Sequence, residues 1–410
     1  MNTAWTTLEV DALLTSPTLL DDPYPVFHRL RREAPVAWSE AWGCWIVTRY
    51  DDVSAILQDH ARFSSFGRVT NVIRRSLPAG ELAQLQPLIS HYSRGLINVD
   101  PPDHTRIRRL VQQTFLPRTL DRLKPHVQAI VKELLDDASA NRQMDVVRDL
   151  AYPLPVTVIA ELMGIPAEER DQFKRWSGQI VEFQATPRIS ADVVGRSQKA
   201  LLELRAYFRD ICVQRRAEPR EDLISLLVQA EDAGDRLTEE ELLSTCVSIL
   251  IGGHETTTNL ITTALWALLN HPEQMRALRE DESLIGGAVE EFLRYEAPLQ
   301  RLGRVAMQDV ALRGQAVKQG QTVLLMLGAA NRDPAQFPDP DRLDIRRQPN
   351  RHVAFGYGVH FCLGAGLARL EAPIAINTML QRMPNLASQT SRLQWQPGVF
   401  RAPVALPVSF

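Results

Sequence analysis

The segment FGYGVHFCLG runs from Phe355 to Gly364 and sets one cysteine, Cys362, directly before the helical pattern LGAGLARLEAPIAI. Backbone N–H groups and the dipole at the start of a helix favour an anion, so the pKa of Cys362 is expected to fall toward the thiolate, the form that binds metal. Gly358 and Gly364 allow a flat ligand to approach closely, and Phe355 can pack against one. A buried thiol in a tight turn is the alternative, but it does not account for all these residues together.

The other cysteines, Cys44, Cys212 and Cys246, are far apart in the chain and form no Cys-x-x-Cys pair. This spacing fits neither a disulfide framework nor a zinc finger. A reducing compartment is the simplest setting, so we expect a cytoplasmic protein in which these three thiols are small buried side chains.

Composition excludes several classes of function. Hydrophobic residues make up 45% of the 410 residues and charged residues 23%, as in an ordinary globular protein, and the formal net charge is −3. There is no basic field to recruit nucleic acid or an anionic membrane. No uninterrupted apolar run reaches the roughly 18 residues of a membrane span, and the N-terminal residues do not resemble a signal peptide. We therefore expect no nucleic-acid partner and no membrane anchor.

The pattern along the chain predicts a mainly α fold with minor β structure. Two apolar runs at 35–39 and 44–48 predict a hairpin, and residues 61–102 suggest a long functional loop with at most one short helix. Helical periodicity covers most of 103–270. Short strands follow, including QTVLLML at 321–327, then a helix over 366–382 and a strand-like tail. The length suggests two domains, but no linker divides the chain, so we expect one domain over 1–410 with an α-rich part, a small β-rich part and no fused reductase.

The longest predicted helix has an unusual centre. It starts with the capping box TEEE at 238–241 and continues to about residue 270. Its middle reads IGGHETTTN at 251–259, although each glycine costs a helix interior about 1 kcal/mol relative to alanine. One interpretation is a kink in which threonine hydroxyls bond back to the chain. The other is a helix opened for a ligand, with Glu255 and Thr256 facing it; the pattern alone does not decide.

Together these motifs resemble the bacterial soluble cytochrome P450 family, the haem-thiolate monooxygenases. Phe355, Gly358, His360, Cys362 and Gly364 fill the family's haem-ligand signature without a departure. The GGHET segment at 252–256 resembles the family's oxygen-binding helix, and EEFLR at 290–294 contains its Glu-x-x-Arg motif. The resemblance extends over nearly the whole chain. It implies the cytochrome P450 fold, with haem between a long central helix and the cysteine-bearing loop.

The resemblance also implies roles for individual residues. Cys362 would be the metal ligand of haem b (iron protoporphyrin IX); in this family the thiolate favours O–O cleavage. Thr256 and Glu255 would be catalytic, delivering protons with His254 nearby. The implied haem-binding residues besides Cys362 are His104, Arg108, Arg304, His360, Phe355, Gly364 and Gly252. The implied structural charge cluster is Glu291, Arg294 and Arg342. The implied substrate pocket comprises Ser248, Ile251, Leu299, Val399, Phe400 and the loop 63–96.

The implied pocket is mostly apolar, so we expect a lipophilic small molecule such as a fatty acid, terpenoid, steroid or polyketide. Arg68, Arg74 and Arg75 are candidates to anchor a substrate carboxylate, although solvated positions are the simpler interpretation because loops run over the surface. Arg106 and Arg109 are candidates for docking an acidic electron donor, or belong to an ordinary solvated face.

The expected reaction inserts one oxygen atom from O2 into the substrate, by hydroxylation or epoxidation. Electrons would come from a ferredoxin or flavodoxin served by an NAD(P)H reductase. The alternatives are a peroxide-driven peroxygenase and a non-catalytic haem-binding accessory protein. The intact Glu255–Thr256 pair argues against both.

Overall fold

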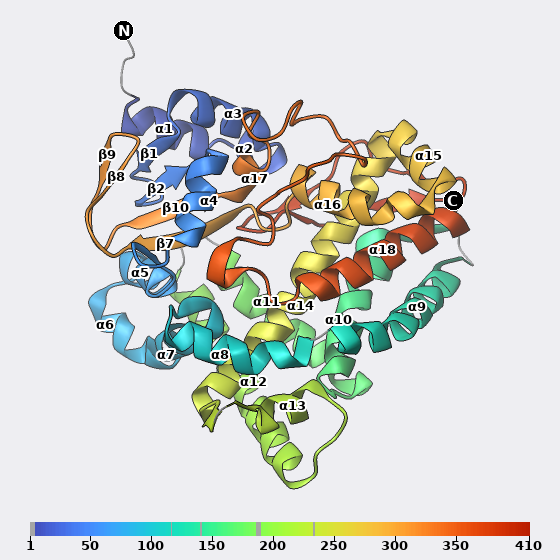
Figure 1. Cartoon of the computed structure of the whole chain (residues 1–410), viewed down its shortest axis with the longest axis horizontal. Helices are drawn as coiled ribbons and strands as arrows, with labels where there is room; N and C mark the ends of the chain where they lie inside the picture. The colour runs from blue at the N-terminus through green and yellow to red at the C-terminus, as the bar shows by residue number, and fades with distance from the viewer. Residues whose placement is uncertain (1–4, 116, 140–141, 186–189, 233) are drawn as a thin grey trace. The chain divides into compact units, whose positions relative to one another are not determined.

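The computed structural model describes residues 5–115, 117–139, 142–185, 190–232 and 234–410 (Figure 1). The chain forms two compact units, each assembled from separate stretches. Unit 1 contains Met1–Phe63, Lys124–Pro155 and Glu255–Phe410, and unit 2 contains Ser64–Leu123 and Val156–His254. Three helices contribute residues to both units: α9 (Pro117–Ser139), α10 (Pro153–Leu162) and α14 (Glu239–Asn270).

Unit 1 combines helices with most of the strands. Its other helices are α1 (Thr7–Leu14), α2 (Thr18–Asp21), α3 (Tyr24–Glu33), α4 (Tyr50–Gln58), α15 (Pro272–Glu280), α16 (Ile285–Tyr295), α17 (Leu327–Ala330) and α18 (Ala365–Arg382), with the 3-10 turn η7 at Gly358–His360. Its main strands are β1 (Val36–Ser39), β2 (Cys44–Val47), β7 (Arg301–Ala306) and β10 (Thr322–Met326), with β3 (Phe63–Ser64) at the sheet edge. Short pairs are β8 (Val310–Leu312) with β9 (Gln315–Val317) and β12 (Trp395–Gln396) with β13 (Ala402–Pro403). A small sheet joins β4 (Gln143–Asp145), β11 (Ala387–Ser388) and β14 (Pro407–Ser409).

The main sheet has the order β1-β2-β10-β7-β3. β1 and β2 are the antiparallel hairpin predicted from the sequence, and β10 runs parallel to β2 and antiparallel to β7. Successive side chains of a strand point to opposite faces. Trp45 and Val47 therefore pack in one core with α4, whereas Cys44 and Ile46 pack in another with α1 and α3. This covering of both faces holds β7, which carries Arg304, in place.

Unit 2 is almost entirely helical. Its helices are α5 (Arg68–Ser76), α6 (Ala79–Leu82), α7 (Gln86–Arg94), α8 (Asp103–Gln112), α11 (Arg170–Ala185), α12 (Ala191–Ala217) and α13 (Leu223–Gln229), with a short hairpin of β5 (Glu231–Asp232) and β6 (Asp235–Arg236). α11 packs along α12 through the aromatic rings of Phe173, Trp176, Tyr207 and Phe208.

The mainly α class with minor β structure is confirmed, as are the long helix and the final helix. The capping box forms as predicted: the Thr238 N–H donates to Oε2 of Glu241 at 2.9 Å, and the Glu241 N–H donates to the Thr238 hydroxyl at 3.3 Å. The predicted loop over 61–102 is wrong, because α5, α6 and α7 occupy most of it. Among the described residues, no helix combines the length and the apolar character that crossing a membrane requires.

Candidate functional site

The cysteine loop of unit 1 holds Cys362 between η7 and α18 with its side chain exposed. The Cys362 N–H donates to the carbonyl oxygen of Phe355 at 2.9 Å and closes the loop. Gly356 and Gly358 have φ values of 71° and 70°, a region that glycine adopts without strain. A Cβ on Gly358 would lie 2.9 Å from the carbonyl oxygen of Leu57 on α4, so a side chain there would force the loop away from α4.

An ion pair that the sequence analysis missed supports the same loop. Arg369 places its guanidinium 4.6 Å from the ring centre of Phe355 and donates from Nε to Oε1 of Glu290 at 2.7 Å. His352 contacts the same carboxylate at 3.0 Å. Burial would raise the pKa of Glu290, but hydrogen bonds from Arg369 and His352 lower it to about 2. Nothing in the sequence pattern around Arg369 indicated this role.

α14 has one accessible face on an otherwise buried stretch. Between 242 and 265 the positions that are not buried are Ser248, Gly252, Gly253, Glu255 and Thr256. Ser248, Gly252 and the Glu255–Thr256 pair recur every three to four residues, which places them on one face of the helix. Nothing lies within 4 Å of a Cβ built on Gly252. The helix therefore offers open backbone, a carboxylate and a hydroxyl along a single line.

The two central glycines differ in role. A Cβ on Gly253 would lie 2.9 Å from Cγ1 of Ile159, so this glycine lets α10 pack closely against α14. His254 is buried, and its Nδ1 lies 2.8 Å from the Leu250 carbonyl oxygen, away from the accessible face. The hydroxyls of Thr262 and Thr263 donate to the carbonyl oxygens of Thr258 and Asn259 at 2.9 and 2.8 Å. The helix is continuous through the motif, from Glu239 to Asn270.

The residues expected at the haem carboxylates fall in both units. In unit 2, His104 is buried on α8, and Arg108, half-buried, follows one turn later on the same face. In unit 1, Arg304 on β7 is only 2% exposed and donates from Nη1 to the Gly303 carbonyl oxygen at 2.9 Å. His360 lies in η7, within the cysteine loop.

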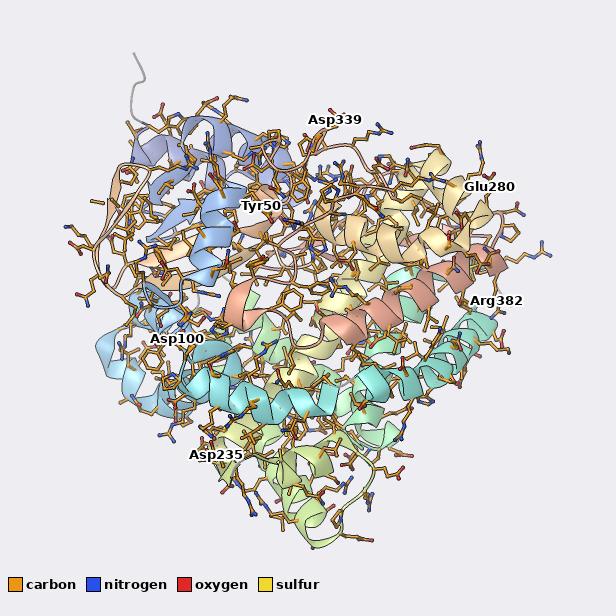
Figure 2. All side chains as sticks on the ribbon, in the orientation of Figure 1. Tyr50, Asp100, Asp235, Glu280, Asp339 and Arg382 are labelled. Carbon is orange, nitrogen blue, oxygen red and sulfur yellow. The ribbon has the colours of Figure 1, made fainter. Side chains whose placement is uncertain are left out.

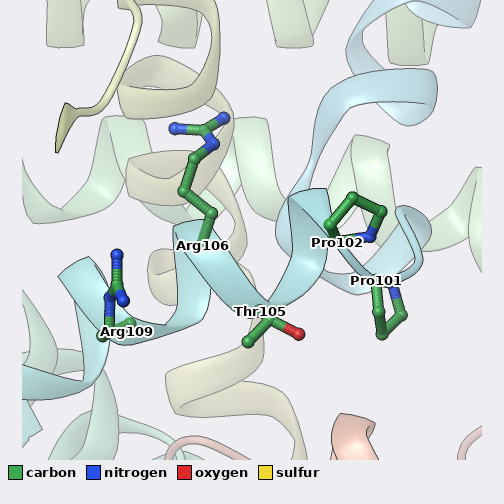
Figure 3. Close-up of a pocket in the computed structure, with 5 residues that line it drawn as sticks. All are labelled: Pro101, Pro102, Thr105, Arg106 and Arg109. Atoms are coloured by element: carbon green, nitrogen blue, oxygen red, sulfur yellow. The ribbon is translucent and has the colours of Figure 1, made fainter.

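A shallow depression of about 530 Å³ lies beside α8, lined by Pro101, Pro102, Thr105, Arg106 and Arg109 (Figure 3). Arg106 is a poor candidate for docking an acidic partner. Its Nη2 forms an ion pair with Glu241, and its Nη1 lies 3.5 Å from Asp235. Arg109, the other arginine that lines this depression, is exposed.

The buried charge cluster differs from the prediction in one residue. Glu291 and Arg294 are both 0% exposed and form a two-pronged pair, with nitrogen–oxygen distances of 2.7 and 2.8 Å. The arginine side chain that joins them is Arg347, whose Nε lies 3.2 Å from Glu291, and Nδ2 of Asn350 donates to the same carboxylate at 3.1 Å. Arg342 is exposed and contributes only its carbonyl oxygen, 3.2 Å from Nη2 of Arg294. The segment RLDIRRQPNR contains four arginines, and nothing in its pattern selects the correct one.

Three predicted pocket residues come together in unit 1. Leu299 and Phe400 face each other in an isolated antiparallel bridge, and the Gln300 N–H donates to the Val399 carbonyl oxygen at 2.9 Å. Leu299, Val399 and Phe400 are all half-buried. On α14, Ser248 lies on the accessible face, whereas Ile251 is buried at its border.

Comparison with known proteins shows the family of this chain. The cytochrome P450 family profile matches residues 45–391. The biotin biosynthesis cytochrome P450 of Bacillus subtilis is 42% identical over 405 residues, covering 96% of this chain and 98% of the relative. The cytochrome P450 monooxygenase PikC of Streptomyces venezuelae is 42% identical over 397 residues, covering 94% and 91%.

Among solved structures, P450BioI in complex with an acyl carrier protein that bears hexadec-9Z-enoic acid has a TM-score of 0.89 and 41% identity. The match covers 97% of this chain and 100% of that one. The chain therefore belongs to the cytochrome P450 family and is a haem-dependent monooxygenase of the bacterial type.

Proposed function

We propose that this monooxygenase inserts one oxygen atom from O2 into a lipophilic small molecule, by hydroxylation or epoxidation. The observation that carries the proposal is the accessible face of α14, on which Glu255 and Thr256 lie beside the open backbone of Gly252. A carboxyl group and a hydroxyl group that lie side by side on the accessible face of a helix can deliver protons to the place where oxygen is activated.

The residues present fit a haem b. The exposed thiol of Cys362 is a soft ligand near the start of α18, and the buried guanidinium of Arg304 suits a carboxylate of the macrocycle. His360, His104 and Arg108 are the further proposed partners of the two carboxylates. When bound, the haem supplies a redox-active iron for oxygen activation, and its thiolate ligand favours O–O cleavage.

The protein's own contribution is to position groups and deliver protons. The Thr256 hydroxyl can donate one hydrogen bond and accept others, so it can hold a water and hand on its proton. Glu255 is half-buried and can take up protons from solvent. His254 is not proposed as a relay, because its ring is buried against the helix backbone.

The proposed substrate is a fatty-acid-like or polyketide-like molecule. The half-buried Leu299, Val399 and Phe400 provide apolar contacts, and Ser248 provides a polar one. The relatives named above include one described as a biotin biosynthesis enzyme and one solved with a fatty acid on its carrier protein. We propose one haem domain over 1–410 in the cytoplasm, with electrons from a ferredoxin or flavodoxin and its NAD(P)H reductase.

The test is a Thr256→Ala variant assayed for product formed per NAD(P)H consumed. Loss of the hydroxyl should lower product yield by about 10²-fold, the scale of one general acid–base group, while NAD(P)H oxidation continues. Thr256→Ser keeps the hydroxyl and should stay near wild type. A Thr256→Ala enzyme that couples as well as wild type would contradict the proton-delivery role.

Turnover measured with hydrogen peroxide and with the complete electron-transfer chain distinguishes a monooxygenase from a peroxygenase and from a non-catalytic haem protein. A peroxygenase would turn over substrate with hydrogen peroxide as fast as with the complete electron-transfer chain, and a non-catalytic haem protein would do neither. We expect turnover that depends on the reductase and the electron carrier.

A further inference from the structure

Arg68, the first residue of α5, has no acidic partner among the described residues. Its Nε donates to Oδ1 of Asn98 at 3.0 Å, and Asn98 is a neutral residue that is only 3% exposed. In the described part of the chain, no carboxylate lies within ion-pair distance of Arg68. Asp100 (Figure 2) is engaged elsewhere, since it accepts from the Ser64 hydroxyl and from the Ser65 N–H at 3.0 Å. The guanidinium therefore has one neutral hydrogen-bond partner among the described residues.

The buried arginines of the same unit are held differently. Arg205 pairs with both carboxylate oxygens of Glu240, at 2.7 and 2.8 Å, and Arg215 pairs with Asp222. Both follow the rule that a charge taken out of water is paired. Arg68 of the same unit is half-buried and has only the neutral Asn98 as a hydrogen-bond partner among the described residues.

Arg301 of unit 1 provides a second contrast. Burial lowers the pKa of Arg301 to about 10, as it does the pKa of Arg68. The guanidinium of Arg301, however, lies 4.8 Å from the ring centre of Trp42, whose face attracts a cation. Arg68 stays charged at neutral pH, because a pKa of about 10 is well above 7.

The position of Arg68 on the helix adds to the cost of its charge. A helix N-terminus carries a partial positive charge, so a cation there is disfavoured and an anion is favoured. Gly67, the residue before it, has φ 80° and gives the helix no side-chain cap. Arg68 itself is half-buried, so a ligand can still reach it. Both the unpaired cation and the uncapped helix end would be stabilised by the same anion.

We propose that Arg68 binds the carboxylate of a lipophilic acid, so that the enzyme selects substrates with an anionic end. The proposal rests on the proposed function and narrows its substrate class. A guanidinium has five N–H donors in a planar fork that matches a carboxylate. Asn98 occupies Nε and orients the fork, which leaves both Nη groups for the ligand. Arg74 and Arg75 of the same helix are exposed and are not part of this site.

The test compares dodecanoic acid with its methyl ester by calorimetric titration of the haem-loaded enzyme. Wild type should bind the acid about 10- to 100-fold more tightly than the ester, the range expected for hydrogen bonds to a charged group. Arg68→Gln should bring this ratio close to one. Arg74→Gln removes the same charge from an exposed position of the same helix and should keep the wild-type ratio.

A structural role for Arg68 is separated by thermal unfolding without ligand. Removing an unpaired charge should leave the Tm of Arg68→Gln equal to or above that of wild type, whereas a residue needed for folding would lower it. An unchanged acid-to-ester ratio in Arg68→Gln would overturn the proposal. Tighter, Arg68-dependent binding of dodecyl phosphate than of the acid would overturn the assignment to a carboxylate. Failure to bind haem would instead refute the proposed function.

Discussion

The buried carboxylate of Glu291 is held by more than its neighbour on α16. Arg294 provides the two-pronged pair, and Arg347 approaches the same carboxylate at 3.2 Å while donating to the carbonyl oxygen of Pro338 at 2.7 Å. Arg347 thus ties the segment before the cysteine loop to α16. Arg342 participates through its backbone alone, which any residue would supply.

Replacing these two arginines separates side-chain from backbone contributions. Arg347→Ala should lower the free energy of unfolding by about 1–3 kcal/mol, because it removes hydrogen bonds to a buried charge and to carbonyl groups. Arg342→Ala should change it by no more than about 0.5 kcal/mol, as for an ordinary surface position. Urea unfolding of both variants gives the comparison. Equal losses, or a larger loss for Arg342→Ala, would contradict the cluster described here.

At the scale of the element, α14 uses its two central glycines for different purposes. Gly253 lets α10 pack close to the helix, and Gly252 keeps the accessible face free of a side chain at this position. Alanine at 252 should stabilise the helix by up to about 1 kcal/mol, since its methyl group meets nothing within 4 Å. The same methyl group projects where oxygen is proposed to bind, so substrate oxidation should fall.

Alanine at 253 should behave in the opposite way. Its methyl group would overlap Ile159, and overpacking of this kind costs about 1–3 kcal/mol. Urea unfolding together with turnover of Gly252→Ala and Gly253→Ala tests the assignment. A Gly252→Ala enzyme with full activity, or a Gly253→Ala protein as stable as wild type, would show that the roles are wrongly assigned.

Polar contacts of the buried His91 join α7, α12 and α14 within unit 2. Nη1 of Arg205 lies 3.2 Å from Nδ1 of His91, and the hydroxyl of Ser244 donates to the His91 carbonyl oxygen at 3.3 Å. Burial lowers the pKa of His91 to about 3, with a further contribution from Arg205. His91 is therefore neutral in the folded protein, whereas in the unfolded chain it takes up a proton below about pH 6.5.

The neutral, buried His91 makes the stability of the fold depend on pH. Since the unfolded state binds more protons between pH 6.5 and about 3, His91 stabilises the fold fully above this window and progressively less as the pH falls through it. The slope from this one group is at most about 1.4 kcal/mol per pH unit. In urea unfolding at pH 7 and pH 5, His91→Gln should lose less stability on acidification than wild type. An identical loss in both proteins would contradict a buried neutral His91.

Across the whole molecule, the elements that could be predicted from the sequence are those that periodicity and capping residues define. The hairpin at β1–β2 and the limits of α14 and α18 follow from alternation, a capping box and a breaking proline. The helices within 61–102 were not predicted, because their short apolar faces become significant only when packed against each other and α12. Family motifs pointed to Glu291 and Arg294, which the structure pairs, and to Cys362, whose role as haem ligand stays a prediction. They could not identify Arg347, because the course of the backbone through the segment 342–351 decides which of its arginines reaches Glu291.

The carbon monoxide difference spectrum of the purified, dithionite-reduced protein tests directly whether Cys362 binds the haem iron as a thiolate. We expect a haem Soret band shifted far to the red, as a Cys362 thiolate ligand produces, and loss of that shift in Cys362→Ser. A haem band without the red shift in the wild-type protein, or no haem at all, would contradict the claim that this loop binds haem through its cysteine.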